Sequence, residues 1–392
     1  MILKILLIMI NLFLLIYALG SALLACIRLP EDEKKEKTEK QHHFAVLICA
    51  RNEANVIGFL LDSLEQQNYP KELIDVYVLI NNCSDDTEKI ASDHGAQILN
   101  CPASVNSKGK ALEYAFETLF DQDQIDVYAV FDADNIADRN FFSEMNKALC
   151  NGEQIIQGKR SGLQKDHSFI SSSYQIYYAM QNAFFNRPHS ERGLSASING
   201  SGWCILKPFI DDVSFECRTI VEDYEYSILC ALKNKKIAYC ETAISYDDFT
   251  DDLKTSLIQR TRWSYGILQC LKRYEGTLIR QAFKGSVSCL LFAYTGMMTF
   301  AVLCLVIAAF GNHIFLSDLI SYPLYLSFSL FLFWMTGVVL SVIALIMNHD
   351  SIVQNIRGIL FYAFFMLSWA PVLVSCFFRR NYEWQPIEHY HS

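Results

Sequence analysis

The sequence predicts an α/β protein whose mostly parallel sheet lies between membrane-spanning segments. From Phe44 onward, short apolar runs alternate with helical patterns, and such alternation builds a parallel sheet covered by helices. Long apolar stretches lie before and after this middle part. Polar clusters follow three of the predicted strands, at the edge where open α/β sheets bind ligands. These observations predict a membrane-associated domain with a ligand site at the carboxyl ends of its strands.

Each predicted element rests on a local pattern. The strands are apolar runs at Phe44–Ala50, Asp75–Ile80, Ala96–Leu99 and Asp126–Phe131. The helices are expected at Glu53–Gln67, at Ser84–His94 and from about Lys108. The sequence Ser-Asp-Asp favours a helix start, and a glycine favours a helix end. The polar clusters at the strand ends are Arg51-Asn52-Glu53, Asn81-Asn82 and Asp132-Ala133-Asp134.

The composition places the chain at a membrane. Hydrophobic residues make up 52% of the 392 residues and charged residues 19%, which is too apolar for an ordinary soluble protein. The run Ile5–Ile27 lacks a small-residue cleavage site and is long enough to cross about 30 Å of hydrocarbon. Basic residues from Arg28 to Lys40 follow this run, so we expect the α/β domain to lie in the cytosol.

Three apolar stretches follow the α/β domain, at Val287–Phe310, Tyr322–Met347 and Ile359–Phe378. We expect them to be membrane segments; the alternative is that they are buried core helices. Three crossings would place Arg379 and Arg380 outside, against the positive-inside tendency. One stretch is therefore expected to lie in the interface or to re-enter. The predicted organisation is an anchor at 1–29, a charged linker at 30–43, the α/β domain at 44–268, an interfacial helix region at 269–286, membrane segments at 287–378 and a tail at 379–392.

Charge and cysteine content exclude two function classes. The net charge is −9, so the chain lacks the basic footprint that nucleic-acid binding requires. None of the 13 cysteines forms a CxxC pair. Buried, reduced thiols explain them better than a zinc site does.

Two carboxylates follow a predicted buried strand. Asp132 and Asp134 are two residues apart, so in extended backbone both side chains project to the same side. They could then share one hard cation with a diphosphate. The alternative is an acidic turn at a strand end, because Asp-x-Asp alone is a weak signal.

A helical pattern at Leu253–Tyr265 carries a second polar set. Gln259, Arg262 and Trp263 are spaced i, i+3 and i+4, which places an amide, a guanidinium and an indole on one helix face. Arginine can bind phosphate oxygens in bidentate fashion, and tryptophan offers a flat wall to a sugar ring. The alternative is an interfacial helix that these side chains anchor beside the bilayer.

Two further blocks stand at expected helix starts. Glu222 and Asp223 precede an apolar-periodic run; one of them could be a general base, or both could only complement the helix dipole. Lys108 and Lys110 flank Gly109, where ammonium and backbone N–H groups can meet an anion. The alternative for the lysines is simple solvation.

Taken together, these blocks resemble the membrane-bound family 2 glycosyltransferases, which include the cellulose, hyaluronan and poly-N-acetylglucosamine synthases. The resemblance covers about Phe44 to Tyr265 and rests on five motifs in order. They are Ala50-Arg51-Asn52-Glu53, the block Asn82 to Thr87, Asp132-Ala133-Asp134, Val221-Glu222-Asp223, and Gln-x-x-Arg-Trp at Gln259, Arg262 and Trp263.

The resemblance implies a GT-A fold, a Rossmann-like sheet, Mg²⁺ or Mn²⁺ as cofactor, a UDP-sugar donor and inversion at the anomeric carbon. It implies a donor site at Ala50, Arg51, Glu53, Asn81, Asn82, Lys108 and Asp132, with Glu53 and Asn82 at the base and ribose. Asp134, with Asp132 beside it, would bind the metal. Asp223, next to Glu222, would be the base. Gln259, Arg262 and Trp263 would hold the leaving diphosphate and the acceptor end, and Asn199–Trp203 would line the acceptor site.

Two positions depart from the family pattern. Asn81 and Asn82 stand where the family usually carries aspartates, so a contact to the base would lack charge. Cys49 stands where the family often has proline. Neither departure affects the metal pair or the base.

The functional hypothesis is a multi-pass enzyme of the plasma membrane, with a cytosolic catalytic domain, that extends a β-linked polysaccharide. One alternative is a non-processive transferase that glycosylates a lipid acceptor. The other is a non-catalytic membrane subunit of a polysaccharide export assembly. The partners expected are a UDP-sugar, a polysaccharide or lipid acceptor and the lipid bilayer.

Overall fold

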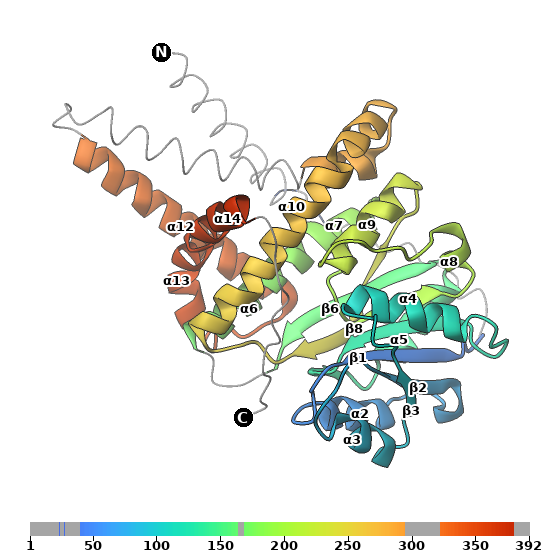
Figure 1. Cartoon of the computed structure of the whole chain (residues 1–392). Helices are drawn as coiled ribbons and strands as arrows, with labels where there is room; N and C mark the ends of the chain where they lie inside the picture. Colours follow the sequence, from blue (N-terminus) through green and yellow to red (C-terminus); the bar gives the residue numbers. More distant parts are fainter. Residues whose placement is uncertain (1–22, 24–26, 28–39, 164–167, 295–321, 380–392) are drawn as a thin grey trace.

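An eight-stranded mixed sheet forms the centre of the protein (Figure 1). The computed structural model describes residues 40–163, 168–294 and 322–379, together with positions 23 and 27. The strands lie in the order β3-β2-β1-β4-β7-β6-β8-β5. Their bounds are β1 Phe44–Ala50, β2 Ile74–Ile80, β3 Gln97–Asn100, β4 Val127–Asp132, β5 Asn135–Ala137, β6 Ile155–Gly162, β7 Trp203–Leu206 and β8 Ala238–Asp247.

The first half of the sheet is parallel, as predicted. Strand β1 pairs in parallel with β2 and β4, and β2 pairs in parallel with β3. Strand β7 is antiparallel to both β4 and β6, and β5 is antiparallel to β8. The carboxyl ends of β1, β2 and β4 therefore meet at one edge, which is the edge that carries the predicted polar clusters.

Helices cover both faces of the sheet. Helices α2 (Ile57–Glu65), α3 (Thr87–Asp93) and α5 (Phe141–Cys150) bury apolar side chains in one core cluster. Helices α4 (Lys108–Leu119), α8 (Phe209–Asp212) and α9 (Glu222–Leu232) contribute to the cluster on the other face. The sheet is thus buried on both sides, which explains why its parallel strands read as continuous apolar runs.

Two predicted helices begin later than expected. The helix expected at Glu53 starts at Ile57, and the one expected at Ser84 starts at Thr87. The intervening residues form loops that hydrogen-bond to each other. The Glu53 N–H donates to Thr87 Oγ1 over 2.9 Å and the Ala54 N–H to Asp85 Oδ2 over 3.0 Å. Asp85 acts across the two loops rather than as the cap of a helix starting at Ser84.

A layer of long helices lies beside the sheet. In Figure 1, α6, α10, α12, α13 and α14 gather on the side of the molecule away from α2 and α3. Their bounds are α6 Phe169–Met180, α10 Leu253–Phe283, α12 Tyr322–Asn348, α13 Ile356–Leu367 and α14 Trp369–Phe378; a π-helix at Gln181–Asn186 and α7 at Arg187–Glu191 continue α6. The helix predicted at Leu253–Tyr265 therefore continues through most of the region expected to be a separate interfacial helix.

The C-terminal helices α13 and α14 pack on α6 and α10. A Cβ atom at Gly358 of α13 would lie 2.5 Å from Ser172 Cβ of α6, so only glycine permits this approach. Helix α13 ends at Leu367 and α14 begins at Trp369. Pro371 has no N–H to donate to the Leu367 carbonyl, which explains the break in the helix.

Among the described residues, Ile356–Phe378 is the stretch long and apolar enough to cross a membrane. It has 23 residues, and an 18-residue window within it has a mean hydropathy of 2.0 and is 44% buried inside the protein. The predicted segment Tyr322–Met347 is helical, and its part Phe333–Asn348 counts as a shorter apolar helix. The predicted anchor at 1–29, most of the linker and tail, and most of Val287–Phe310 lie outside the described residues.

Two glycines of α10 test how tightly this helix is packed. A Cβ at Gly266 would lie 2.5 to 3.0 Å from the Val221 side chain, whereas a Cβ at Gly276 would meet nothing within 4 Å. Overpacking costs about 1–3 kcal/mol, and replacing glycine by alanine in a helix gains up to about 1 kcal/mol. We expect Gly266→Ala to lower the thermal unfolding temperature of the detergent-solubilised protein and Gly276→Ala to leave it unchanged or raise it. Equal shifts in the two variants would contradict this packing.

Candidate active site

A cavity of about 730 Å³ opens at the carboxyl ends of β1, β2 and β4. It collects almost every residue that the sequence singled out. The predicted residues that line it are Ala50, Arg51, Glu53, Asn81, Lys108, Asp132, Asp134, Glu222, Asp223, Gln259, Arg262 and Trp263. Residues far apart in the chain, from 50 to 263, therefore face one space.

Trp203 of the predicted acceptor segment lies in the core of the sheet rather than in this cavity. Asn82, from the predicted donor site, does not line the cavity either. Its backbone is left-handed, with φ of 54°, a conformation that asparagine tolerates better than most residues. Its amide donates to the Val105 carbonyl over 3.2 Å and to Asn81 Oδ1 over 3.0 Å. The role that the resemblance implied for Asn82 at the base and ribose is not supported by this geometry, because the side chain holds a turn instead.

The two loops after β1 and β2 form one wall of the cavity. Asn52 also has a left-handed backbone, with φ of 60°, and its Oδ1 accepts from the Ser84 N–H over 2.7 Å. Together with the bonds from Glu53 and Ala54, this contact fastens the two loops side by side. The asparagine of the Ala-Arg-Asn-Glu motif is therefore a structural residue, and its neighbours Arg51 and Glu53 face the cavity.

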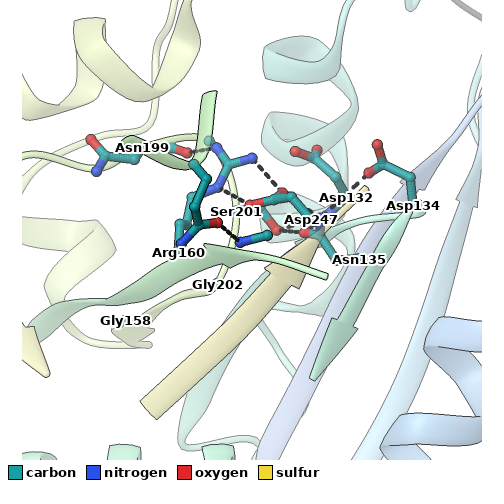
Figure 2. Close-up of polar contacts among 12 residues, drawn as sticks. Asp132, Asp134, Asn135, Gly158, Arg160, Asn199, Ser201, Gly202 and Asp247 are labelled. Carbon is teal, nitrogen blue, oxygen red and sulfur yellow. Dashed lines mark hydrogen bonds and ion pairs between the residues drawn. The ribbon is translucent and has the colours of Figure 1, made fainter. Parts of the chain in front are cut away.

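The acidic pair lies at the end of β4. Asp132 is the last residue of the strand and Asp134 stands in the turn before β5. The connection is a turn rather than the extended backbone expected, but both carboxylates lie on the same side of the sheet edge (Figure 2). Burial, followed by the charges of Asp134 and Asp132, raises the pKa of the nearby Glu53 carboxyl to about 9. Glu53 is thus close enough to the pair to sense its charge.

Lys108 supplies the cation at this edge. It opens α4, which Ser107 caps by accepting from the Lys110 N–H. The Lys108 ammonium donates to Asp132 Oδ1 over 2.5 Å and to the Gly200 carbonyl over 2.7 Å, and Glu222 Oε1 lies 3.5 Å away. Burial alone would lower the pKa of Lys108, but Asp132 and Glu222 outweigh burial and raise the pKa. Burial likewise opposes ionisation of Asp132, yet Lys108 lowers the pKa of that carboxyl.

The predicted base faces the acidic pair. Glu222 and Asp223 start α9, as the sequence indicated. A Cβ at Gly200, where φ is +84°, would lie 3.4 Å from Asp223 Oδ2 and 3.8 Å from Asp132 Oδ2. Both carboxylates therefore point at the same spot. Burial raises the pKa of Asp223, against the lowering effect of Lys108, and raises the pKa of Glu222 to about 6.

Helix α10 places Gln259, Arg262 and Trp263 on the opposite wall. The Trp263 ring lies 6.4 Å from the Tyr177 ring and 6.3 Å from the Trp369 ring, and these two rings are 5.5 Å apart. This aromatic triangle keeps Trp263 inside the protein, so the lipid-anchor alternative does not fit. The Nε atom of Arg262 is buried without a hydrogen-bond partner among the described residues, which makes Arg262 the natural ligand for an incoming anion.

Arg260, two residues earlier, faces the other way. It is fully buried, and its Nη1 donates to Ser368 Oγ over 2.7 Å and to the Phe365 carbonyl over 3.2 Å. The guanidinium also lies over the Phe365 ring, 4.5 Å from its centroid. Arg260 therefore fastens the α13–α14 break to α10, and Trp369 of α14 reaches the cavity.

The sequence did not reveal one charged pair in the cavity. Arg160 of β6 donates to Asp247 of β8 through Nε over 2.9 Å and through Nη2 over 2.5 Å (Figure 2). Asn135 adds a bond of 2.7 Å to the same carboxylate, and Tyr178 lies under the guanidinium, 4.6 Å away. In the sequence, Arg160 stands beside Lys159 and Asp247 stands beside Asp248, and neither position belongs to one of the five motifs.

The predicted acceptor segment also lies at this pair. The Arg160 Nη1 donates to the Asn199 carbonyl (Figure 2), and Asn199 and Gly200 line the cavity. The Asn199 N–H donates to Gln157 Oε1 over 2.8 Å. Its backbone is therefore fixed from both sides.

Comparison with known proteins identifies the family. Residues 41–266 match the family described as Glycosyltransferase like family 2. This match covers more than half of the chain, and the chain belongs to that family. The prediction of a family 2 glycosyltransferase domain is thereby confirmed.

One curated relative is the probable glycosyltransferase YdaM of Bacillus subtilis (strain 168). It is 23% identical over 241 residues, which cover 59% of this chain and 57% of YdaM. The chain therefore spans little more than half the length of this relative.

One of two similar solved structures supports the fold. The mannosyltransferase PcManGT from Pyrobaculum calidifontis, solved with GDP-Man and Mn²⁺, is 12% identical with a TM-score of 0.60 over 91% of this chain and 98% of its own. The glucosyl-3-phosphoglycerate synthase from Mycobacterium tuberculosis, solved with Mn²⁺ and UDP, is 17% identical with a TM-score of 0.42 over 61% of this chain and 84% of its own. The first likeness shows that the chain has a GT-A-like α/β fold.

The Arg160–Asp247 pair should contribute strongly to stability. Removing one partner of a buried ion pair leaves an uncompensated charge and costs about 3–5 kcal/mol. We expect Asp247→Asn to lower the free energy of unfolding by this amount in denaturant titrations. The exposed pair Arg218–Glu216, 3.3 Å apart, provides the control, since Glu216→Gln should change the free energy of unfolding by less than about 0.5 kcal/mol. A loss in Asp247→Asn no larger than in the control would show that the pair is energetically unimportant.

Proposed function

We propose that this protein transfers a hexose from a UDP-sugar, with inversion, to a growing β-linked polysaccharide. The observation that supports this is the convergence of Asp223 with Asp132 and Lys108 in one cavity, opposite Arg262, whose Nε has no hydrogen-bond partner among the described residues. A diphosphate would meet the two cations, and an acceptor hydroxyl would meet the carboxylate of Asp223. We also propose that the protein is a synthase of the cellulose and hyaluronan type and that UDP is the nucleotide of its donor.

The transfer is a single displacement. The acceptor hydroxyl oxygen attacks the anomeric carbon while Asp223 takes the hydroxyl proton, because a neutral hydroxyl is a poor nucleophile. The bond from the anomeric carbon to UDP breaks as the new glycosidic bond forms. Arg262 and Lys108 stabilise the charge that develops on the leaving diphosphate. One attack from the opposite side gives inversion.

Asp134 and Asp132 would hold Mg²⁺ or Mn²⁺. No group of three or more metal-ligating side chains occurs in the described parts of the chain, and Asp132 Oδ1 is already bound to Lys108. Two carboxylates nevertheless fit Mg²⁺, which commonly takes one or two carboxylates together with substrate phosphates. The ion would supply positive charge beside the diphosphate. Unchanged UDP affinity on addition of Mn²⁺, measured by calorimetry, would refute this role.

The acceptor is proposed to be a saccharide because an aromatic wall stands beside the base. Tyr177, Trp263 and Trp369 line the cavity next to Asp223, and sugar rings pack well on aromatic faces. A lipid-linked acceptor is the second candidate, favoured by the exposed phenylalanines of α13. Product sizes from membranes supplied with labelled UDP-sugar distinguish them: long polymers support the first and single additions the second.

We further propose that α13 and α14 lie in the plane of the membrane surface. Their inner face packs on α6 and α10, while Phe361, Phe364 and Phe378 are 49%, 57% and 83% exposed. A helix with one face on the catalytic domain can bury the other in the interface, which would keep the tail on the cytosolic side. Probes attached at position 364 should be quenched by shallow rather than deep bromolipids; deep quenching would indicate a spanning helix.

Replacing the proposed base tests the enzymatic assignment. A general base contributes about 10²–10⁴-fold, so we expect Asp223→Asn to lower UDP release by at least about 100-fold with UDP binding retained. Asp211→Asn, at an exposed aspartate of α8, is the control and should match the wild type. Equal release from Asp223→Asn and wild type would favour the non-catalytic subunit.

The pH dependence follows from the raised pKa values of the carboxyl pair. The base must be deprotonated, so activity is lost as pH falls through its pKa. Burial raises the pKa of Asp223 above the ordinary value of about 3.9, and the pKa of Glu222 is about 6. We expect the acid limb of kcat/KM to lie near pH 6 and to belong to the pair. An acid limb near pH 4 would mean that burial does not act on the base.

A further inference from the structure

The segment just before the base is held from two sides. Residues 218–221 connect Cys217 to the start of α9, and Thr219, Ile220 and Val221 line the cavity. Glu222 and then Asp223 follow this segment, so the position of the segment sets the position of the base. Its anchors lie outside the five motifs that identified the site.

The first anchor is a buried carboxylate of α9. Glu225 is fully buried, and its Oε2 accepts from the Arg218 N–H over 2.7 Å and from the Thr219 N–H over 2.6 Å. The other oxygen, Oε1, accepts from the Tyr274 hydroxyl over 2.5 Å. Three donors on one carboxylate stabilise the buried charge, and they tie the segment to both α9 and α10.

The other anchors lie on α10. Gln269 Oε1 accepts from the Ile220 N–H over 3.2 Å. Gly266 lets the helix approach Val221 so closely that an added Cβ would lie 2.5 Å from the valine side chain. Arg262, Gly266 and Gln269 are spaced i, i+4 and i+7, so they share one face of the helix. The face that presents Arg262 to the cavity is therefore the face that holds the base segment.

We propose that Glu225, Gln269 and Tyr274 are positioning residues that clamp residues 218–221 to α10 and so fix the base Asp223 relative to Arg262. This inference rests on the proposed function. Because α10 is one continuous helix from Leu253 to Phe283, it acts as a rigid link between the diphosphate cation and the base segment. The alignment of the acceptor with the leaving group therefore depends on the side chains of this clamp, although they contact neither the acceptor nor the leaving group.

Glu225→Gln tests the clamp with the least change in shape. A glutamine keeps one acceptor oxygen for the two backbone N–H groups, but it loses the charge that strengthens these bonds, and the Tyr274 hydroxyl must turn to accept from the glutamine amide. Misplacing a reacting group by about 1 Å can cost about 100-fold in rate. We expect kcat to fall about 10- to 100-fold, while the affinity for UDP, which contacts other walls, stays within about threefold of the wild type.

Two further variants complete the design. Tyr274→Phe removes one donor and keeps both backbone bonds, so kcat should fall less, by about three- to tenfold at unchanged UDP affinity; it decides the question if Glu225→Gln does not fold. Glu216→Gln is the matched control, because Glu216 is an exposed glutamate just before the segment and pairs only with Arg218 in the described contacts. It should keep the wild-type kcat.

The outcomes separate this inference from the proposed function. A kcat within twofold of the wild type in the folded variants, or a parallel loss of kcat and UDP affinity, would overturn the clamp. If Asp223→Asn also releases UDP at the wild-type rate, the proposed function fails with it. If Asp223→Asn is inactive while Glu225→Gln and Tyr274→Phe are fully active, the inference alone fails.

Discussion

The ammonium group of Lys108 holds the active site together. It contacts the carboxylate of Asp132 at the end of β4, the carbonyl of Gly200 in the acceptor segment, and the carboxylate of Glu222 at the start of α9. The two carboxylates carry like charges that would otherwise repel each other in a partly buried space. Because one cation balances them, the base segment and the acidic pair can face the same cavity.

Two arginines of α10 face different parts of the protein. Arg262 faces the cavity, and its Nε has no hydrogen-bond partner among the described residues. Arg260 is buried on the side away from the cavity and donates to Ser368 at the break between α13 and α14. The same helix thus connects the anion-binding wall to the apolar C-terminal helices. Since Trp369 of α14 lines the cavity, a change in how these helices pack on α10 would reach the cavity directly.

Local sequence predicted the parallel half of the sheet and most of the site. The strands at Phe44 and Asp126 and the helix start at Lys108 agree with the structure within one residue, because buried strands and capped helices leave strong local patterns. The helix starts at Glu53 and Ser84 were wrong by three or four residues. There, bonds between two loops replaced the first turn of each helix, and no single segment contains both partners.

The sequence by itself determined which polar groups stand at strand ends and on one helix face, because chain geometry converts residue spacing into direction. It therefore offered Asp132, Asp134 and Arg262 as candidates, and the family resemblance singled out Asp223 as the base. Only the tertiary structure decided that Asn82 turns away from the cavity, that Arg160 pairs with Asp247 across 87 residues, and that Glu225 grips the base segment. Periodicity shows which side of its own element a residue occupies, but the partner on that side is set by how distant elements pack.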